Sequence, residues 1–160
     1  MIAANGHAVV YLGDDERGEF LYRFVSERKY TQGGDNRDLL ENATLYVAKF
    51  IDNLRGEWIP LTPATTGMTE AEICIHSRIA ASKVGATTMD RPEWVAANPV
   101  KTEVYCALTN NKNRGVKPNA GGDETPALGP NPREKNNYGQ IVRWSPDNED
   151  HTANGFTWDL

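Results

Sequence analysis

A guanidinium and a carboxylate lie two residues apart in the segment Asp90-Arg91-Pro92-Glu93. A residue that precedes proline is restricted to extended conformations, and alternate side chains of an extended chain point the same way, so we expect Arg91 and Glu93 to share a face. An arginine can bind two phosphate oxygens at once, and a carboxylate can bind a hard cation such as calcium. The segment therefore fits a site for a phosphate group and a metal ion. The alternative is a structural ion pair, because charge pairs often serve the fold alone.

Three consecutive carboxylates, Asp14, Asp15 and Glu16, follow an apolar run that ends at Gly13. Crowded carboxylates are costly without a counterion, and hard cations take several oxygen ligands, so this run is a second candidate metal site. The alternative is a solvated turn between two strands, helped by the flanking glycines and balanced by Arg17. On sequence alone the turn is the stronger interpretation.

Further polar residues flank a long loop rich in proline and glycine, namely Asn110, Asn111, Arg114 and Arg133. They could position a phosphate ester, but asparagines in such loops more often satisfy backbone groups, so the sequence assigns them no catalytic role. The three histidines have no partner four residues away, which argues against zinc. Cys74 and Cys106 are not in metal-type spacing; we expect free thiols in a core, with one disulfide as the alternative.

The composition is that of an ordinary globular protein. The 160 residues are 39% hydrophobic and 24% charged, and they carry a formal net charge of -5. A mildly acidic chain gives no reason to expect nucleic acid, which needs clustered lysine and arginine, although it suits divalent cations. No window approaches the length of a membrane span, and the first five residues do not resemble a signal peptide.

The elements that must position these residues are mostly short strands. Alternating or β-branched runs bounded by turn residues predict strands at 7–12, 20–25, 44–51, 57–61, 92–96, 103–109 and 138–144. Residues 156–160 have the composition of a strand without a later partner, and an unpaired edge would favour self-association through exposed edge strands. Residues 110–137 are expected to form a long irregular loop.

One helix is predicted over residues 69–84. Thr69 and Glu72 form a capping box, and Gly85 provides a stop. Apolar residues follow at helical spacing and should form the buried face: Ala71, Cys74, Ile75 and Ile79. Many short strands joined by tight turns predict a mainly β domain, either a propeller, a sandwich or a barrel.

Several segments, taken in order, resemble the PhoX-type alkaline phosphatases, which are bacterial calcium- and iron-dependent phosphatases. The matching segments are Met89-Asp90-Arg91-Pro92-Glu93-Trp94, residues 103–111, Asn131-Pro132-Arg133, Asn136 and residues 138–144, with residues 11–16 and 44–50 before them. The resemblance covers nearly the whole chain. It implies that residues 1–160 form a single partial β-propeller domain with an inserted helix near 69–84.

The resemblance also implies a function and a site. The family hydrolyses phosphate monoesters with calcium and iron, and it is exported, so the parent protein is expected to be periplasmic or extracellular. At matching positions the resemblance makes Arg91 the phosphate clamp and Glu93 a metal ligand, with Glu16 the preferred ligand of the acidic run and Asp15 second. The family's N-terminal iron-ligand segment and its C-terminal blades are missing, so we expect an internal fragment lacking part of the active site.

Two other functions stay open. The chain could be a non-catalytic propeller module that binds calcium or a partner protein. It could also come from another propeller hydrolase, such as a calcium-dependent lactonase. Convergence of Glu16, Arg91 and Glu93 on one cavity would favour the phosphatase.

Overall fold

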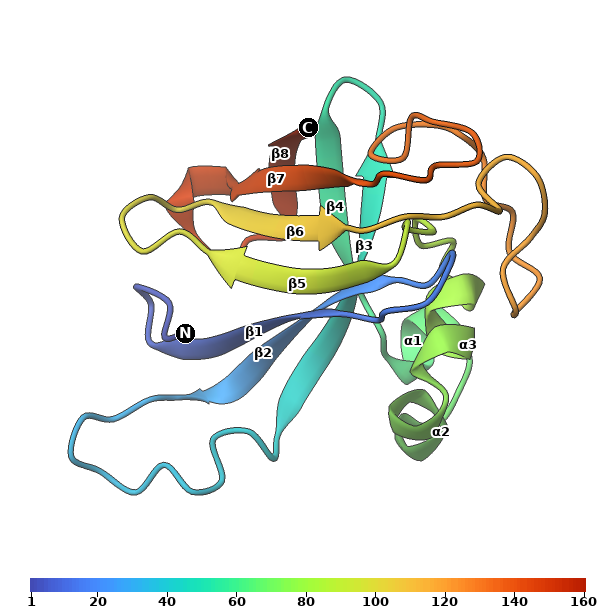
Figure 1. Cartoon of the computed structure of the whole chain (residues 1–160). Helices are drawn as coiled ribbons and strands as arrows, with labels where there is room; N and C mark the ends of the chain where they lie inside the picture. The colour runs from blue at the N-terminus through green and yellow to red at the C-terminus, as the bar shows by residue number, and fades with distance from the viewer.

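Two groups of four antiparallel strands form the framework of the computed structural model, which describes residues 1–160 (Figure 1). The first group consists of β1 (His7–Gly13), β2 (Leu21–Lys29), β3 (Ala43–Ile51) and β4 (Arg55–Pro60). The second consists of β5 (Pro92–Ala97), β6 (Val104–Leu108), β7 (Gln140–Pro146) and β8 (Gly155–Asp159). Within each group the strands pair in chain order, as expected for the predicted hairpins.

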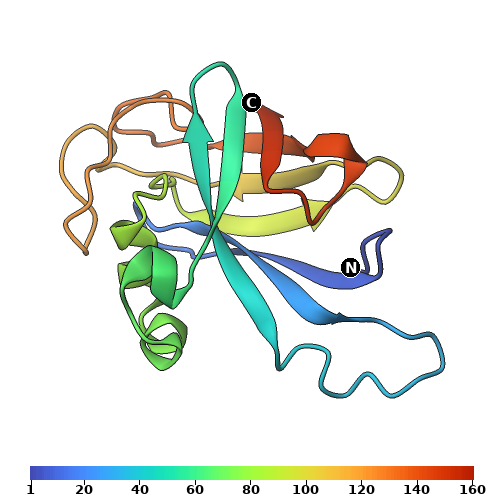
Figure 2. The ribbon, with the colours of Figure 1, turned by 180° about the vertical axis from the view of Figure 1, so that it is seen from behind.

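Strand β8 joins the two groups because it pairs with both β4 and β7. The strand order is β1-β2-β3-β4-β8-β7-β6-β5, so β1 and β5 are the edges of one sheet. Figure 2 shows from behind that the β3–β4 hairpin crosses the direction of β5 and β6. The prediction that residues 156–160 begin a strand without a partner is therefore wrong, and β8 is not an exposed edge.

The main core lies between the two groups. Alternation places Val104, Cys106 and Leu108 of β6 inside, while the intervening residues are half-buried. These side chains pack with aromatic residues of other strands, including Trp58, Trp144, Phe156 and Trp158. Trp94 differs from the other three tryptophans, since it is 76% exposed on β5.

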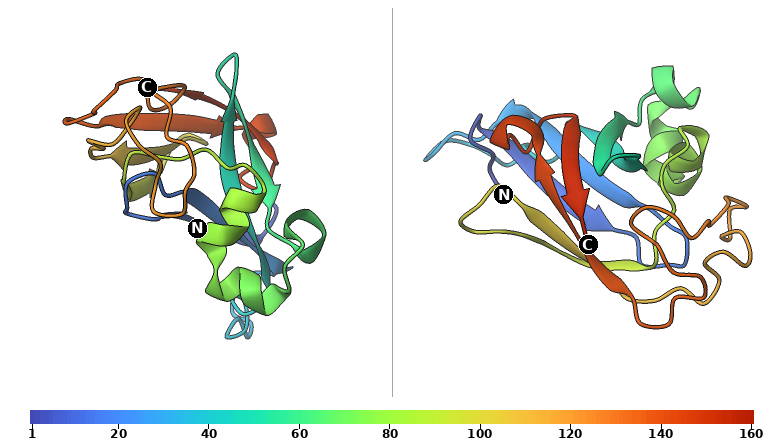
Figure 3. Two further views of the ribbon diagram at one scale, coloured as in Figure 1. Left: turned by 90° about the vertical axis from the view of Figure 1, so that its right-hand side faces the viewer. Right: turned by 90° about the horizontal axis from the view of Figure 1, so that it is seen from above.

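Three short helices cover the face of β2 and β3 that points away from the second group (Figure 3). They are α1 (Pro63–Thr66), α2 (Glu70–Ile75) and α3 (Ser77–Lys83). The buried residues of α2 and α3 are Ile73, Ala80 and Ala81. These pack against Phe20, Tyr22, Val47 and Leu61 and form a second, smaller core.

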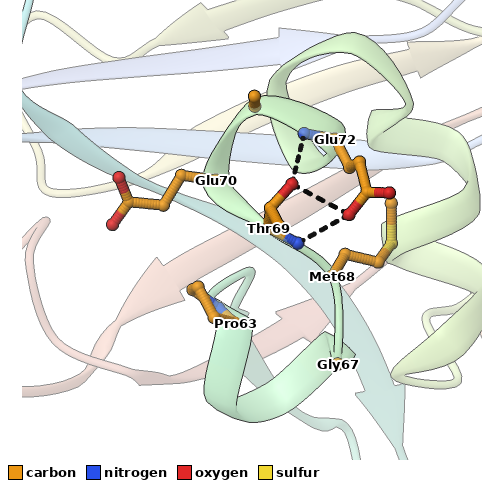
Figure 4. Close-up of a pocket in the computed structure, with 7 residues that line it drawn as sticks. Pro63, Gly67, Met68, Thr69, Glu70 and Glu72 are labelled. Carbon is orange, nitrogen blue, oxygen red and sulfur yellow. Dashed lines mark hydrogen bonds between the residues drawn. The ribbon is translucent and has the colours of Figure 1, made fainter.

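The single helix predicted over 69–84 is in fact two helices. The capping box is present, with Thr69 Oγ1 accepting from the Glu72 amide and Glu72 Oε2 accepting from the Thr69 amide (Figure 4). The helical conformation breaks at His76, where φ is -120° and ψ is 49°. The predicted buried face is also wrong in both halves: Ala71, Cys74, Ile75 and Ile79 are all exposed, and Ile73, Ala80 and Ala81 are buried instead.

The long loop between β6 and β7 has no strand or helix of its own, as predicted. Isolated bridges join Asn111 to Asn136 and Leu128 to Asn131. A 3-10 turn, η1 (Asp147–Glu149), precedes β8. Cys74 is exposed and Cys106 is buried, and both are free thiols, so the expected core position holds for Cys106 alone. None of the helices is long and apolar enough to cross a lipid bilayer.

Candidate active site

The end of β1 lies directly against the start of β5. A Cβ atom on Gly13 would lie 2.1 Å from the carbonyl oxygen of Pro92, so only glycine permits this approach. Beyond it, the Gly18 amide donates to Met89 O over 2.9 Å, and the Met89 amide donates to Glu19 O over 2.8 Å. The loop after β1 is thereby held beside the segment that leads into β5.

This approach brings together four side chains from three segments. Arg91 Nε lies 3.0 Å from Asp15 Oδ1, and Arg91 Nη2 lies 3.1 Å from Asp15 Oδ2 and 3.2 Å from Glu93 Oε1. Thr109 Oγ1, just after β6, donates to Glu93 Oε1 over 2.7 Å. We call Asp15, Arg91, Glu93 and Thr109 the Arg91 cluster. Its three charged side chains are 27% to 42% exposed, so solutes can reach them.

Arg91 does not have the extended backbone that its position before proline predicts. Its φ is +54°, in the left-handed region that costs a residue with a side chain about 1–3 kcal/mol. The pairing of β5 with β6 also shifts register between Pro92 and Trp94. Arg91 and Glu93 do meet, but a left-handed turn and an irregular strand start bring them together, not alternation along an extended chain.

The three carboxylates of the acidic run do not act as a unit. Asp14 accepts two hydrogen bonds of 2.7 Å from Arg78 of α3, which raises the pKa of that arginine. Glu16 accepts from the backbone amide of Arg17 over 2.6 Å. Asp15 alone reaches Arg91. The structure thus places Asp15 in the cluster and the preferred candidate, Glu16, against its own neighbour.

Asp90 and Arg114 form a buried ion pair that sequence reasoning did not assign. Arg114 Nε lies 2.6 Å from Asp90 Oδ1, and the two side chains are 1% and 0% exposed. Burial lowers the pKa of Arg114, and the carboxylate of Asp90 opposes that effect. The available signal was an acidic residue beside Arg91 and an arginine in the asparagine-rich loop, but nothing local pairs positions that far apart.

The side chains of this chain supply part of a metal site at most. Nowhere do three or more His, Cys, Asp or Glu side chains come together as metal ligands. In the Arg91 cluster, Asp15 and Glu93 offer carboxylate oxygens, whereas calcium takes about six to eight oxygen ligands. An open hollow of about 630 Å³ lies elsewhere, beside α1 and α2, and is lined by none of the candidate residues (Figure 4). The chain therefore does not fit a complete calcium or iron centre by itself.

Comparison with known proteins identifies the relatives of this arrangement. The family described as alkaline phosphatase PhoX matches residues 1–160. The chain belongs to the PhoX alkaline phosphatase family. The solved structure of Pseudomonas fluorescens PhoX in complex with vanadate, a transition state analogue, is 48% identical in sequence and superposes with a TM-score of 0.89. No curated protein matches the chain.

The PhoX match covers all of this chain but only 30% of the solved PhoX chain. The resemblance seen in the sequence is thus confirmed, as is the predicted fold class: the chain is mainly β and corresponds to part of a β-propeller protein. Because the chain spans less than a third of that relative, the match alone does not assign the activity of a whole PhoX protein to this chain.

Proposed function

We propose that this chain contributes a phosphate-binding arginine and two metal-binding carboxylates to the active site of a phosphate monoester hydrolase. The observation that supports this most directly is the meeting of Arg91 with Asp15 and Glu93 at an accessible position, within a PhoX sequence. The solved relative binds vanadate, which resembles a phosphate in transfer. The remaining ligands and catalytic groups would come from parts of the parent protein outside this chain.

Arg91 has a donor to spare for a phosphate oxygen. Its contacts with Asp15 and Glu93 use Nε and Nη2, and Nη1 has no partner. A guanidinium that donates to phosphoryl oxygens stabilises the negative charge that spreads over them in the transition state. If a phosphate displaced Asp15, Arg91 could present two parallel N–H groups to it.

The charge of the cluster explains why a cation is part of the proposal. Two carboxylates and one guanidinium leave a net charge of -1, which would repel a phosphate dianion. A calcium or iron ion held by Asp15 and Glu93 would reverse that sign and, when bound, would polarise the phosphoryl group. Arg91, which now pairs with these two carboxylates, would then be free to donate to the substrate.

Binding of vanadate to this chain tests the proposal. We expect saturable vanadate binding by calorimetry when calcium and iron are supplied, and its loss in Arg91→Lys, since lysine lacks the planar fork of donors. Arg37→Lys is the matched control, because Arg37 is 90% exposed and pairs only with Asp35. Absence of vanadate binding in the unaltered chain, or equal affinity in both variants, would contradict the proposal.

Hydrolysis separates the phosphatase from the two other functions. Turnover of an aryl phosphate that a chelator abolishes would show that a working site assembles from copies of this chain. Calcium binding without vanadate binding would indicate a non-catalytic module, and hydrolysis of lactones alone would indicate a lactonase. The same assays on the full-length parent then test the activity of the whole protein.

A further inference from the structure

The residue directly before Arg91 is held by a buried polar network. Arg114 Nε donates to Asp90 Oδ1 over 2.6 Å, and Asn136 Nδ2 donates to Asp90 Oδ2 over 2.9 Å. Asp90, Arg114 and Asn136 are each at most 2% exposed. Both oxygens of one carboxylate are therefore fixed by donors from the long loop between β6 and β7.

The same loop also binds the backbone on either side of Asp90. The amide of Asp90 donates to Asn131 Oδ1 over 3.0 Å, and Asn131 Nδ2 donates to Thr88 O over 3.0 Å. Arg114 Nη2 adds a 2.9 Å bond to Thr88 O. Downstream, the Thr109 amide donates to the carbonyl of Arg91 itself over 3.3 Å. The segment 88–91 is thus bonded through side chains and backbone.

These many hydrogen bonds to residues 88–91 can hold the unfavourable backbone conformation of Arg91. A left-handed conformation in a residue with a side chain persists only where its surroundings over-determine it. Every anchor of the network falls on residues 88–90, directly before the residue with that conformation. Burying a carboxylate, a guanidinium and two amides is costly unless all are bonded, so the network tolerates little movement.

We propose that Asp90, Arg114, Asn131 and Asn136 form a positioning network that holds Arg91 in its left-handed conformation and so directs its guanidinium to the phosphate. None of these four residues makes a hydrogen bond or an ion pair with the Arg91 guanidinium, so they act through the backbone. The part of this proposal that concerns phosphate rests on the proposed function, whereas the control of the Arg91 conformation by the network does not.

The test follows Arg91 directly, by NMR of its side-chain Nε–H group in the 160-residue chain. In the native chain this nitrogen lies 3.0 Å from Asp15 Oδ1 in a salt bridge, so its hydrogen is expected to exchange slowly with water. Two variants weaken the network: Arg114→Met, which leaves Asp90 without its main partner, and Asn136→Ala, which keeps the Asp90–Arg114 pair and so safeguards folding. The Arg91 Nε–H signal and the vanadate affinity of each variant are measured well below its unfolding temperature.

Arg23→Met is the matched control. Arg23 is also a fully buried arginine, which donates to the carbonyls of His151 and Ala153 and makes no contact with Arg91. Its replacement should lower the unfolding temperature as the network variants do. A purely structural role for Arg114 would make the two arginine variants behave alike in every other measurement.

We expect both network variants to shift the Arg91 Nε signal, to speed its exchange roughly 10-fold, and to weaken vanadate binding roughly 10-fold, with neither change in Arg23→Met. An unaltered Arg91 signal in both folded network variants, or an equal change in Arg23→Met, would overturn the proposal. If the native chain binds no vanadate while the network variants still move the Arg91 signal, the proposed function fails and the positioning proposal stands.

Discussion

Arg91 Nε lies 3.0 Å from Asp15 Oδ1, although the two residues are 76 positions apart in the chain. The loop after β1 and the segment before β5 carry these residues, and β1 and β5 are the edge strands of the sheet. The contact therefore lies where the two strand groups meet at their first strands. A ligand bound by Arg91 would therefore lie beside both groups of strands.

Replacing Arg91 should move two affinities in opposite directions. In Arg91→Met, Asp15 and Glu93 lose the cation that they share, so we expect calcium to bind more tightly and vanadate to bind more weakly. Titration of each ligand by calorimetry measures both. The free energy of unfolding should change by less than about 1 kcal/mol, because exposed ion pairs contribute little. Weaker binding of calcium would contradict competition between Arg91 and the metal.

Gly13→Ala should loosen the contact of β1 with β5. The new Cβ would meet the Pro92 carbonyl at 2.1 Å, and backbone cannot yield as a flexible side chain can. We expect a loss of roughly 1–3 kcal/mol in the free energy of unfolding, measured with urea. The control is Gly121→Ala, where the nearest atom is 3.4 Å away and a change within about 0.5 kcal/mol is expected. Equal stability of the two variants would argue against a tight approach at Gly13.

Stability should fall as the pH drops below the ordinary pKa of histidine because of His151. Burial lowers the pKa of His151 from its ordinary value of 6.5, and nearby Arg23 and the N-terminus act in the same direction while Asp150 opposes them. Just below pH 6.5 the unfolded chain binds a proton at this histidine more readily than the folded chain does. The stability from His151 is therefore fully present above pH 6.5 and declines below it, by at most about 1.4 kcal/mol per pH unit.

Urea unfolding at several pH values between about 7.5 and 5 measures this slope. His151→Gln should flatten the slope, since glutamine keeps a polar group near Tyr11, whose hydroxyl is 3.0 Å from His151 Nδ1. His76→Gln, at an exposed position, serves as the control and should leave it unchanged. A slope that survives in His151→Gln would assign the pH dependence to other groups.

The two cysteines should differ in reactivity. Cys74 is exposed, whereas Cys106 is buried and its burial raises the pKa of the thiol to about 12, so only the Cys74 sulfur is accessible to reagents. A colorimetric thiol reagent should label one thiol in the native chain and a second after denaturation. Cys74→Ser should abolish native labelling. Labelling of both thiols without denaturant would show that the core around Cys106 opens readily.

The local patterns of the sequence predicted most strands and the start of α2. Alternation marks Val104, Cys106 and Leu108, and the capping box of Thr69 and Glu72 needs only four neighbouring residues. The break at His76 was not predictable, because no proline or glycine marks it. The pairing of β8 with β4 was missed for another reason: it joins distant segments, and no local pattern records such a partner.

The sequence indicated which residues lie at the candidate site but not all of the contacts that they make. Arg91 and Glu93 were singled out, and the structure brings them together, while their roles in binding phosphate and metal stay predictions. The choice between Asp15 and Glu16 was not predictable, because neighbouring carboxylates look alike until Arg17 engages one of them. Asp90 and Arg114 were missed as a pair since burial, which gives them their importance, is a property of the folded loop.

The pairing of β8 with β4 can form only late in the synthesis of the chain. The indole of Trp158 donates to the carbonyl of Arg55, 103 residues earlier, so the outer edge of β4 has no partner until β8 has been made. At about 5–20 residues per second, that delay is roughly 5–20 seconds. During it β4 is an open edge in a slow-folding, non-local topology, and mispairing with another nascent chain competes with correct closure. We therefore expect the yield of folded protein to depend on translation rate and on chaperones more than its equilibrium stability would suggest.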